Sequence, residues 1–452
     1  MKKCDILNAK NYDAIIIGFG KGGKTLAGFL ANKGKKVALV EKDKKMYGGT
    51  CINVGCIPTK ILVEESQKVD KKFKKAIEKK DELTSKLREI NYNKLNLHEN
   101  IDIYTGIGAF ESEHIISVTE DENEIVLNGN QIFINTGSKT IIPKIDGLKT
   151  TRNIYTSTSI MELNELPKKL AVIGGGYIGL EFSSIYNNFG SEVIIFEGNE
   201  DILLREEMEI REEVKENFKT RGIQILSKSK VLKLSNYSDN QVEIVFNQDE
   251  KENKIVVDGV LIAVGRVPNI DDLKLENAGI NYSEKGILVN NTLQTNVPHI
   301  YALGDVKGGA QFTYISLDDF RIIKNNLFGD KTMTTEVRNI IPYSVFISPT
   351  LSKVGLSEKE AINAGYKVKT KVIKASTIPR AKILGDERGV LKAVVDEKNG
   401  KILGCSLYST ESSEVINVVA MAIKENKEYT YLRDFVFTHP TMSEALNDLF
   451  DF

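Results

Sequence analysis

Several features are scarce or absent in this 452-residue chain. It contains no tryptophan and only four cysteines, too few for a disulphide scaffold, so we expect a reducing, cytoplasmic location. No apolar run approaches the roughly 20 residues of a membrane span, and the N-terminal segment lacks the apolar core of a signal peptide. The net charge of −1 gives no basis for electrostatic binding to nucleic acid. We therefore expect neither nucleic acid nor a membrane as a partner.

The length predicts two to four domains, and one internal repeat organises them. Residues 12–43 and 169–200 both run from an apolar strand through a glycine-rich turn and a helix to a second apolar strand with an acidic end. This order is that of a βαβ unit, which therefore occurs twice.

The first repeat carries the spacing G-x-G-x-x-G directly after its strand, at Gly18, Gly20 and Gly23. In such a loop the glycines permit a tight turn, the approach of a pyrophosphate and close packing of helix on strand. The helix N-terminus then faces the negative charge, and Glu41 stands where a carboxylate can bind ribose hydroxyls. This repeat predicts a dinucleotide site.

The second repeat has the same spacing at Gly174, Gly176 and Gly179, with Glu197 at the end of its second strand. Two such loops imply two dinucleotides. A carboxylate at Glu197 favours a free 2′-hydroxyl over a 2′-phosphate, so NADH is favoured over NADPH here.

The remaining segments vary in character. Residues 62–92 have helical spacing and dense mixed charge, which predict one long solvated helix. Residues 101–148 and 223–265 alternate as strands. From about residue 340 strands and helices continue without a glycine-rich loop, which indicates a third kind of domain.

Two cysteines, Cys51 and Cys56, have four residues between them in the segment GGTCINVGCIPTK, residues 48–60. Residues i and i+5 do not face each other on a regular helix, so a reactive pair here requires a distorted helix start, where the dipole stabilises a thiolate. Zinc would need a second pair of ligands, but Cys4 and Cys405 are isolated and the histidines are scattered. We expect a redox-active pair and no metal site.

These motifs together resemble the class I pyridine nucleotide-disulphide oxidoreductases, a family that includes glutathione reductase, dihydrolipoamide dehydrogenase and mercuric reductase. The resemblance covers essentially the whole chain, in the family's order. It rests on the two glycine loops, GGTCINVGCIPTK and four further segments: NTGS (135–138), AVGR (263–266), YALGD (301–305) and THPTMSE (438–444).

The resemblance implies an α/β fold with two Rossmann-like domains and a C-terminal α+β dimerisation domain. The expected division is an FAD-binding domain in two parts, residues 1–148 and 269–338, an NAD(P)-binding domain, 149–268, and an interface domain, 339–452. It also implies a homodimer whose active site is shared between subunits.

The resemblance assigns catalytic roles as well. Cys51 would exchange electrons with the substrate and Cys56 would contact the flavin. Lys60 would lie near the reactive flavin nitrogen, paired with Glu181. His439 and Glu444 would form an acid–base dyad contributed by the other subunit. His98, His114 and His299 are expected to be structural, and Cys405 to be a packing residue.

Further positions match cofactor-binding residues of the family. Tyr177 matches the side chain that covers the flavin and moves aside for nicotinamide. Asp305 matches the aspartate that bonds the ribityl chain, and Arg266 matches an arginine near the nicotinamide dinucleotide. The other positions implied in FAD or NAD(P) binding are Gly49, Thr50, Lys60, Thr136, Gly137, Gly265 and Gly304.

Within the family the chain lacks the C-terminal cysteine pair of mercuric and high-molecular-weight thioredoxin reductases. It also lacks the arginine of glutathione reductases after the first loop. It most resembles the bacterial hypothiocyanous acid reductases and reactive-chlorine-resistance flavoproteins, through GFGKGGKTLAG, MYGGTCINVGCIPTK, GGAQFTYISLDDFR and NDLF. Dihydrolipoamide dehydrogenase, a flavin-dependent Cu(II) or Hg(II) reductase and a non-catalytic redox sensor are the alternatives.

Two aromatic residues, Phe312 and Tyr314, bear on the choice of substrate. They belong to the segment from Gln311 to Arg321, which is bulkier than the small-residue helix typical of the family. They could narrow the path to Cys51 and favour a tiny oxidant, although ordinary helix packing is the favoured explanation for them.

Overall fold

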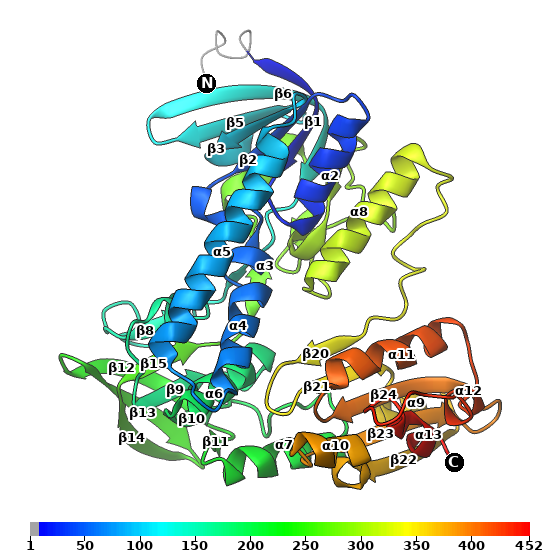
Figure 1. Cartoon of the computed structure of the whole chain (residues 1–452). Coiled ribbons are helices and arrows are strands. Elements are labelled where there is room, and N and C mark those ends of the chain that lie inside the picture. Colours follow the sequence, from blue (N-terminus) through cyan, green and yellow to red (C-terminus); the bar gives the residue numbers. More distant parts are fainter. Residues whose placement is uncertain (1–8) are drawn as a thin grey trace. The chain divides into compact units, whose positions relative to one another are not determined.

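The computed structural model describes residues 9–452, which form two compact units (Figure 1). The first unit contains residues 9–62, 74–141 and 265–338, and the second contains 63–73, 142–264 and 339–452. Among the helices of residues 9–452, none has the length and apolar character needed to cross a bilayer. Cys4 lies outside the described residues.

The first unit is built on a seven-stranded sheet in the order β3-β2-β1-β6-β5-β4, with β19 beside β6. Strand β1 runs parallel to both β2 and β6, and places Ile15 opposite Ala38 and Ile132. The strands are β1 (Lys10–Ile17), β2 (Val37–Glu41), β3 (Ile101–Thr105), β4 (Ile107–Phe110), β5 (Ile115–Glu120), β6 (Asn123–Ile134) and β19 (Ile300–Ala302).

Strand β1 is buried on both faces, as a central parallel strand should be. Ala14 and Ile16 pack into one apolar cluster with helix α2 (Lys21–Asn32), and Ile15 and Ile17 pack into another on the opposite face. The βαβ unit predicted over residues 12–43 is present. It ends with β2, so Glu41 lies at the carboxyl edge of the sheet.

The helix predicted over residues 62–92 is not continuous, so that prediction was wrong. Helix α3 (Thr50–Asn53) is followed by α4 (Cys56–Ser66) and, after a break, by α5 (Phe73–Asn96). The Ser66 hydroxyl donates back to the Val63 carbonyl at 2.8 Å, and Val69 in the break is fully exposed. The break contains no apolar side chain that packs, and mixed charge alone did not reveal it.

The remaining elements of the first unit surround the sheet. Helix α8 (Thr313–Phe328) packs beside α2 (Figure 1). Short strands form two small ladders, β7 (Ser138–Thr140) with β16 (Arg266–Pro268), and β17 (Tyr282–Ser283) with β18 (Gly286–Ile287).

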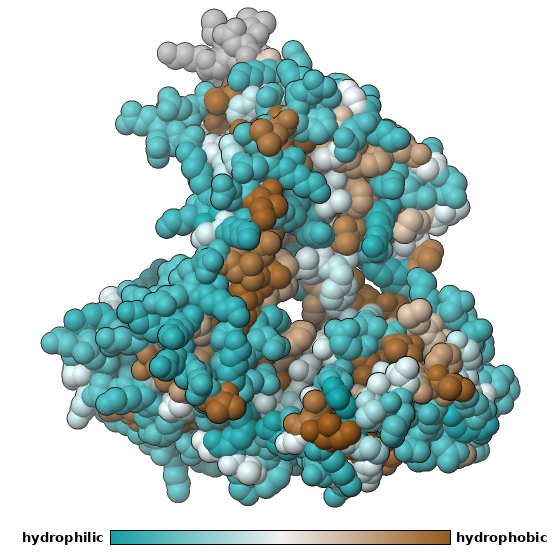
Figure 2. All heavy atoms as spheres, viewed as in Figure 1, coloured by the Kyte–Doolittle hydropathy of each residue, from teal (hydrophilic) through white to brown (hydrophobic). Residues whose placement is uncertain are grey.

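The second unit contains the second βαβ repeat in a five-stranded parallel sheet of order β11-β10-β9-β15-β8. Its elements are β8 (Ile154–Thr156), β9 (Lys169–Ile173), α6 (Tyr177–Phe189), β10 (Glu192–Phe196), α7 (Met208–Thr220), β11 (Gln224–Leu226) and β15 (Gly259–Ile262). An antiparallel sheet of β12 (Lys230–Ser238), β13 (Gln241–Gln248) and β14 (Lys251–Val257) packs on this core, and hydrophilic side chains cover its outside (Figure 2).

Residues 339–452 of this unit form a second five-stranded sheet, in the order β20-β21-β24-β23-β22. The strands are β20 (Tyr343–Val345), β21 (Leu351–Gly355), β22 (Val368–Lys374), β23 (Val390–Asp396) and β24 (Ile402–Tyr408). The helices are α9 (Glu358–Asn363), α10 (Pro379–Leu384), α11 (Ser412–Lys424), α12 (Thr430–Arg433) and α13 (Ala445–Leu449). Cys405 is buried in β24, in keeping with a packing role.

A buried lysine joins this sheet to the N-terminal ends of helices α7 and α9. Lys392 of β23 is only 2% exposed, and its Nζ lies 3.0, 3.0 and 2.6 Å from carboxylate oxygens of Glu207, Glu209 and Glu358. A lone buried ammonium would be strongly unfavourable, and these carboxylates compensate its charge.

Candidate active site

The first glycine loop is shaped by contacts that exclude larger residues. Gly18 has φ of +106°, and a Cβ there would lie 2.3 Å from the Asn135 carbonyl oxygen. The Asn135 side chain accepts from the Gly23 backbone N–H at 2.9 Å and donates to the Leu303 carbonyl at 2.7 Å. Gly20 caps helix α2 without a side chain that could compete with an anion at the helix N-terminus, and the Gly22 N–H donates to the Ser316 hydroxyl at 3.1 Å.

Glu41 lies at the mouth of this loop. Its Oε2 accepts from the Phe19 N–H at 3.0 Å, and burial raises the pKa of its carboxyl group. The bond fixes the carboxylate beside the loop, where its remaining acceptor capacity can meet ribose hydroxyls.

Gly49 brings the cysteine segment against the same loop. Its φ is +86°, and a Cβ there would lie 2.6 Å from the Gly20 Cα. Thr50 follows as the first residue of α3. The start of the cysteine helix therefore lies directly beside the first dinucleotide loop.

The two cysteines lie on either side of the predicted helix distortion. Cys51 belongs to α3 and Cys56 begins α4, and the helix is interrupted at Val54, whose φ is −141°, and Gly55. Both thiols are free in this structure, Cys51 half-buried and Cys56 exposed. The interruption changes the direction of the chain, so residues at i and i+5 can face each other.

The pKa values of the two cysteine thiols are shifted in opposite directions. A hydrogen bond from the Cys51 thiol is the main cause that lowers the pKa of Cys56 to about 6, and Thr313 and the Lys60 charge lower it further. The same bond, together with burial, raises the pKa of Cys51. Cys56 is therefore the thiolate of the reduced pair near neutral pH, and Cys51 carries the proton.

This proton distribution gives a pH-dependent prediction. In the reduced protein, alkylation of Cys56 by iodoacetamide should rise to half its plateau rate near pH 6, because only the thiolate reacts. An unperturbed cysteine thiol would reach half its plateau rate near pH 8.5, because its pKa is about 8.5. Peptide mapping assigns the modified thiol, and Cys56→Ser is the control, in which Cys51 should react only at alkaline pH. A half-point above about pH 8 for Cys56 would contradict the assignment.

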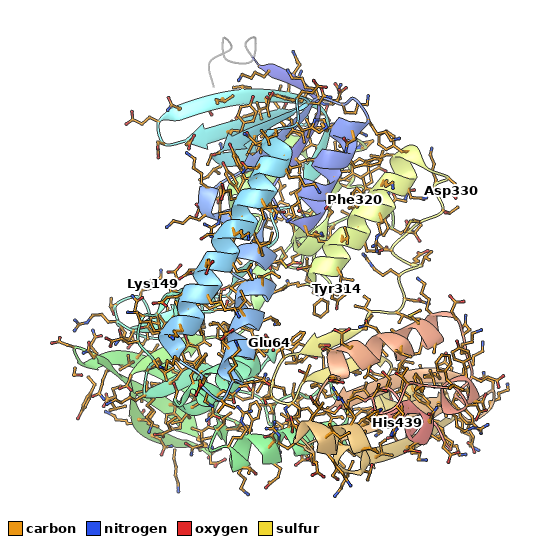
Figure 3. The ribbon with its side chains drawn as sticks, viewed as in Figure 1. Glu64, Lys149, Tyr314, Phe320, Asp330 and His439 are labelled. Atoms are coloured by element: carbon orange, nitrogen blue, oxygen red, sulfur yellow. The ribbon has the colours of Figure 1, made fainter. Side chains whose placement is uncertain are left out.

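The start of helix α8 adjoins the cysteines. The Thr313 Oγ1 lies 3.4 Å from the Cys56 sulphur. On either side of Thr313, Phe312 and Tyr314 stack on each other with ring centroids 5.1 Å apart and an angle of 9° between the planes. Tyr314 stands at the start of α8 (Figure 3), and burial, with the nearby Cys56 charge, raises its pKa.

Ser138, which was not predicted, links two predicted residues of the first unit, Asp305 and Arg266. Ser138 donates to Asp305 at 2.9 Å and accepts from the Arg266 guanidinium at 2.9 Å. Burial raises the pKa of Asp305. Thr136 donates to the Asn269 carbonyl at 2.7 Å, and Gly304 and Gly137 both have positive φ.

The space at Gly137 fits a bound cofactor, because a Cβ there would meet no atom within 4 Å. With the helix start at Gly20, which has no capping side chain, and the fixed Glu41, the first unit has features that suit FAD. The structure thus brings the first loop, the cysteine segment and the Ser138–Asp305 network together in one unit.

Lys24 is a residue that motif analysis missed. It follows the third loop glycine, and its ammonium donates to the Gly48 carbonyl at 3.0 Å and to Asn91 at 2.7 Å. Burial lowers its pKa to about 8. Its place immediately after G-x-G-x-x-G was the only local signal. Thr313 and Asn135 were missed as well.

The second glycine loop has the same construction in the second unit. Gly174 has φ of +110°, and a Cβ at Gly179 would lie 2.0 Å from the Gly174 carbonyl oxygen. A Cβ at Gly176 would meet no atom within 4 Å, so space is open at the start of α6. Glu197 accepts from the Gly175 N–H at 2.8 Å, as Glu41 does from Phe19. These features fit a nicotinamide dinucleotide.

Tyr177 and Glu181 lie one turn apart on α6. The Tyr177 hydroxyl donates to Glu206 at 2.6 Å, and its ring stacks on Tyr343. Glu181 is buried and accepts from the Phe346 backbone N–H at 2.8 Å. Both residues thus contact the chain around β20.

His439 and Glu444 form the predicted pair near α13 (Figure 3). The His439 Nδ1 lies 2.7 Å from a carboxylate oxygen of Glu444, while the His439 side chain is 72% exposed. The carboxylate can fix the imidazole so that Nε2 faces outwards. This arrangement suits a proton donor or acceptor acting on another molecule.

Two family models match the chain. A family model described as pyridine nucleotide-disulphide oxidoreductase matches residues 12–319, and one described as the dimerisation domain of the same family matches residues 341–450. They confirm the predicted fold, two Rossmann-like domains followed by a dimerisation domain.

Two curated relatives and one solved structure cover nearly the whole chain. The probable pyridine nucleotide-disulfide oxidoreductase RclA of Escherichia coli strain K12 is 45% identical over 440 residues, or 97% of this chain and 98% of the relative. Mercuric reductase of Lysinibacillus sphaericus is 32% identical over 98% of this chain and 82% of its own length. A structure described as the Cu(II) complex of HOCl-induced flavoprotein disulfide reductase RclA from E. coli matches with a TM-score of 0.94, at 44% identity over 98% of this chain and 99% of that chain.

Proposed function

The chain belongs to the pyridine nucleotide-disulphide oxidoreductases, flavoprotein enzymes that use FAD and a pyridine nucleotide, and we propose that it reduces hypothiocyanous acid to thiocyanate through Cys51 and Cys56. The contact of the Phe312–Tyr314 segment with the cysteine pair carries the choice of substrate. Thr313 lies 3.4 Å from Cys56, and a stacked pair of aromatic rings flanks it.

The aromatic pair limits what can reach the thiols. Two stacked rings are rigid and bulky, and the nearby Cys56 charge contributes to the raised pKa of Tyr314. A sulphur electrophile with only four non-hydrogen atoms needs a narrow approach, whereas lipoamide or glutathione must bring a longer chain past these rings. This supports a small oxidant over a large disulphide.

The cofactor assignments follow from the two cradles. The first loop, Glu41, Gly49, Thr50, Thr136, Gly137, Gly304 and Asp305 would hold FAD. The second loop, Tyr177 and Glu197 would hold the nicotinamide dinucleotide, with Gly265 and Arg266 contributing. Bound FAD would supply electron transfer from the nicotinamide to the cysteine pair, and Lys60, with Glu181, would lie beside it.

The chemistry of the pair then balances in two steps. A Cys51 thiolate attacks the sulphur of hypothiocyanous acid, which forms a Cys51–S–SCN adduct and releases hydroxide. The Cys56 thiolate next attacks the Cys51 sulphur, which forms the disulphide and releases thiocyanate. Each turnover consumes two electrons and yields one water after protonation.

The resting proton on Cys51 adds a requirement to this scheme. In the reduced pair Cys51 is the protonated thiol and donates a hydrogen bond to the Cys56 thiolate. A base must therefore remove the Cys51 proton before Cys51 can attack. His439, oriented by Glu444, suits this role and can return the proton to the leaving hydroxide. The match to the dimerisation domain supports a homodimer, and we propose that the dyad acts on the pair of a second copy.

The nicotinamide dinucleotide is proposed to be NADH. The Glu197 carboxylate is fixed by the Gly175 and Asn199 N–H groups, both at 2.8 Å, at the position where the adenosine ribose binds in this fold. A 2′-phosphate would meet this negative charge. We expect kcat/KM for NADH to exceed that for NADPH by roughly tenfold or more, about the cost of one unfavourable charge contact.

The same comparison in two variants checks the cause. Glu197→Gln should narrow the preference, whereas Glu200→Gln, which changes an exposed carboxylate of the same loop, should leave it as in the wild type. A clear preference of the wild type for NADPH would contradict the assignment.

A second candidate function is reduction of Cu(II) by the same thiols. It is favoured by the solved structure of a Cu(II) complex of a 44% identical reductase. Within residues 9–452 no group of three or more histidine, cysteine, aspartate or glutamate residues is arranged to hold a metal. In this alternative a copper ion would be a substrate that reacts at the cysteine pair.

The three free cysteines among the described residues suit a reducing compartment, and we propose a cytoplasmic location.

The substrate assignment is tested by measuring the rate of NADH oxidation with each of three electron acceptors: hypothiocyanous acid, lipoamide and Cu(II). The proposal requires kcat/KM for hypothiocyanous acid to exceed that for either of the others by roughly a hundredfold, about 3 kcal/mol in transition-state binding. Faster lipoamide turnover would instead identify a dihydrolipoamide dehydrogenase.

A further inference from the structure

A buried cluster of two tyrosines and one carboxylate lies at the start of α6, within the second unit. The hydroxyl groups of Tyr177 and Tyr343 both donate to the same oxygen of Glu206, each at 2.6 Å. The two rings stack with centroids 5.5 Å apart and 28° between their planes. Glu206 is only 7% exposed.

The bonding of Glu206 is incomplete. Its Oε1 accepts both phenol protons, while its buried Oε2 has no hydrogen-bond partner within residues 9–452. No ion pair joins Glu206 to a cation of the same described residues, so the phenols are its only charge-stabilising donors there. A buried oxygen without a partner destabilises the fold, so packing alone does not account for a carboxylate at this position.

The two phenols remain donors over the working pH range. Burial, with the Glu206 charge next in importance, raises the pKa of both Tyr177 and Tyr343. Distances of 2.6 Å are those of charge-assisted O–H···O⁻ bonds, which are stronger than bonds between neutral groups.

The cluster holds a residue that stands at the dinucleotide loop. Tyr177 is the first residue of α6, directly after Gly176, where space is open for a ligand. One turn later, Glu181 accepts from the Phe346 backbone N–H at 2.8 Å. The segment 343–346 of the dimerisation domain therefore fixes two residues of one face of α6.

We infer that Glu206 and Tyr343 are positioning residues that hold the Tyr177 ring in place and set the free-energy cost of moving it when the nicotinamide dinucleotide binds. The inference rests on the proposed function, in which the second glycine loop and Tyr177 hold the nicotinamide dinucleotide. Binding then breaks the Tyr177 bond to Glu206, while Tyr343 keeps the carboxylate in place. The cluster tunes affinity for the nucleotide without touching the reacting atoms.

The test is anaerobic flavin reduction in the FAD-loaded homodimer, measured by rapid mixing over a range of NADH concentrations. In Glu206→Gln the acceptor is neutral, and in Tyr343→Phe the carboxylate loses its second donor and is less firmly held. We expect the half-saturating NADH concentration to fall by roughly threefold to tenfold in Glu206→Gln, since a charge-assisted bond becomes an ordinary one. Tyr343→Phe should shift it by at least about twofold, with limiting rates within about twofold of the wild type in both variants.

Epistasis separates this role from a general effect on the fold. Tyr177→Phe removes the hydroxyl that bonds Glu206. In the double variant with Glu206→Gln, the half-saturating NADH concentration should therefore differ from that of Tyr177→Phe by less than about twofold. Tyr155→Phe, which removes a half-buried hydroxyl of the same unit that bonds Asn153, is the matched control and should behave as the wild type. If Glu206→Gln does not fold, Tyr343→Phe alone and with Tyr177→Phe gives the same comparison.

Two outcomes would overturn the inference alone: unchanged half-saturation in Glu206→Gln and Tyr343→Phe, or an effect of Glu206→Gln that persists in the Tyr177→Phe background. A wild-type flavin that neither NADH nor NADPH reduces would overturn the proposed function, and this inference with it.

Discussion

Replacement of Cys51 by serine is expected to reduce NADH oxidation by hypothiocyanous acid roughly a thousandfold or more, the scale seen when a nucleophile is removed. The serine hydroxyl is not ionised near neutral pH and cannot form the S–S bond on which the second step depends. It can still donate a hydrogen bond to Cys56, so the Cys56 thiolate should persist. Flavin reduction by NADH should remain close to the wild-type rate.

The control for this variant is Cys405→Ala, which changes a buried cysteine of β24. It should retain the full oxidant-dependent rate in folded protein. If Cys51→Ser kept more than about a tenth of the wild-type turnover, the thiol would not be the nucleophile, and direct oxidation of the flavin would be the better explanation.

Replacement of Gly18 by alanine is expected to abolish retention of FAD. The residue has φ of +106°, a region that L-residues avoid, and the new Cβ would lie 2.3 Å from the Asn135 carbonyl oxygen. Backbone cannot move aside there without displacing the Asn135 side chain, which holds Gly23 and Leu303. We expect the Kd for FAD to rise roughly a hundredfold, about 3 kcal/mol, as measured by flavin fluorescence on titration.

Two further glycine variants make this prediction specific. Gly28→Ala lies within helix α2, where the nearest atom to the new Cβ is Leu95 Cδ2 at 3.5 Å, an ordinary contact. It should bind FAD normally, because alanine favours a helix. Gly174→Ala should spare FAD binding and weaken binding of NADH, since that loop belongs to the other unit. Loss of FAD in both loop variants alike would indicate general unfolding.

The parts of the site that the sequence predicted are those whose chemistry is local. Gly18 and Gly174 predict a positive φ because other residues adopt that conformation only with strain. The spacing of Cys51 and Cys56 requires the helix interruption found at Val54. The acidic ends of β2 and β10 follow from the strand periodicity. Each of these signals lies within one βαβ unit or one turn.

The parts that were missed depend on residues far apart in the chain. Thr313 contacts Cys56 across 257 residues, and Tyr343 bonds Glu206 across 137. No periodicity links such positions, so only the folded chain shows them. The break between α4 and α5 was missed for another reason: the lysines and glutamates of residues 62–92 favour helix, and a polar segment gives no sign of where packing ends.

The distribution of the proton within the cysteine pair also required the structure. Sequence predicts two thiols near a helix start, but the direction of the hydrogen bond between them decides which one is the thiolate. Because Cys51 donates this hydrogen bond, Cys56 has the low pKa and Cys51 keeps the proton that we propose His439 removes.

The central claim is that electrons reach the oxidant through the cysteine pair. The most direct measurement mixes the two-electron-reduced enzyme with hypothiocyanous acid under anaerobic conditions and follows the thiolate–flavin charge-transfer absorbance together with thiocyanate release. We predict that the band disappears with one thiocyanate formed per reduced pair, because Cys56 is consumed in the disulphide. Thiocyanate release while the band persists would contradict the account, since reduction would then bypass Cys51 and Cys56.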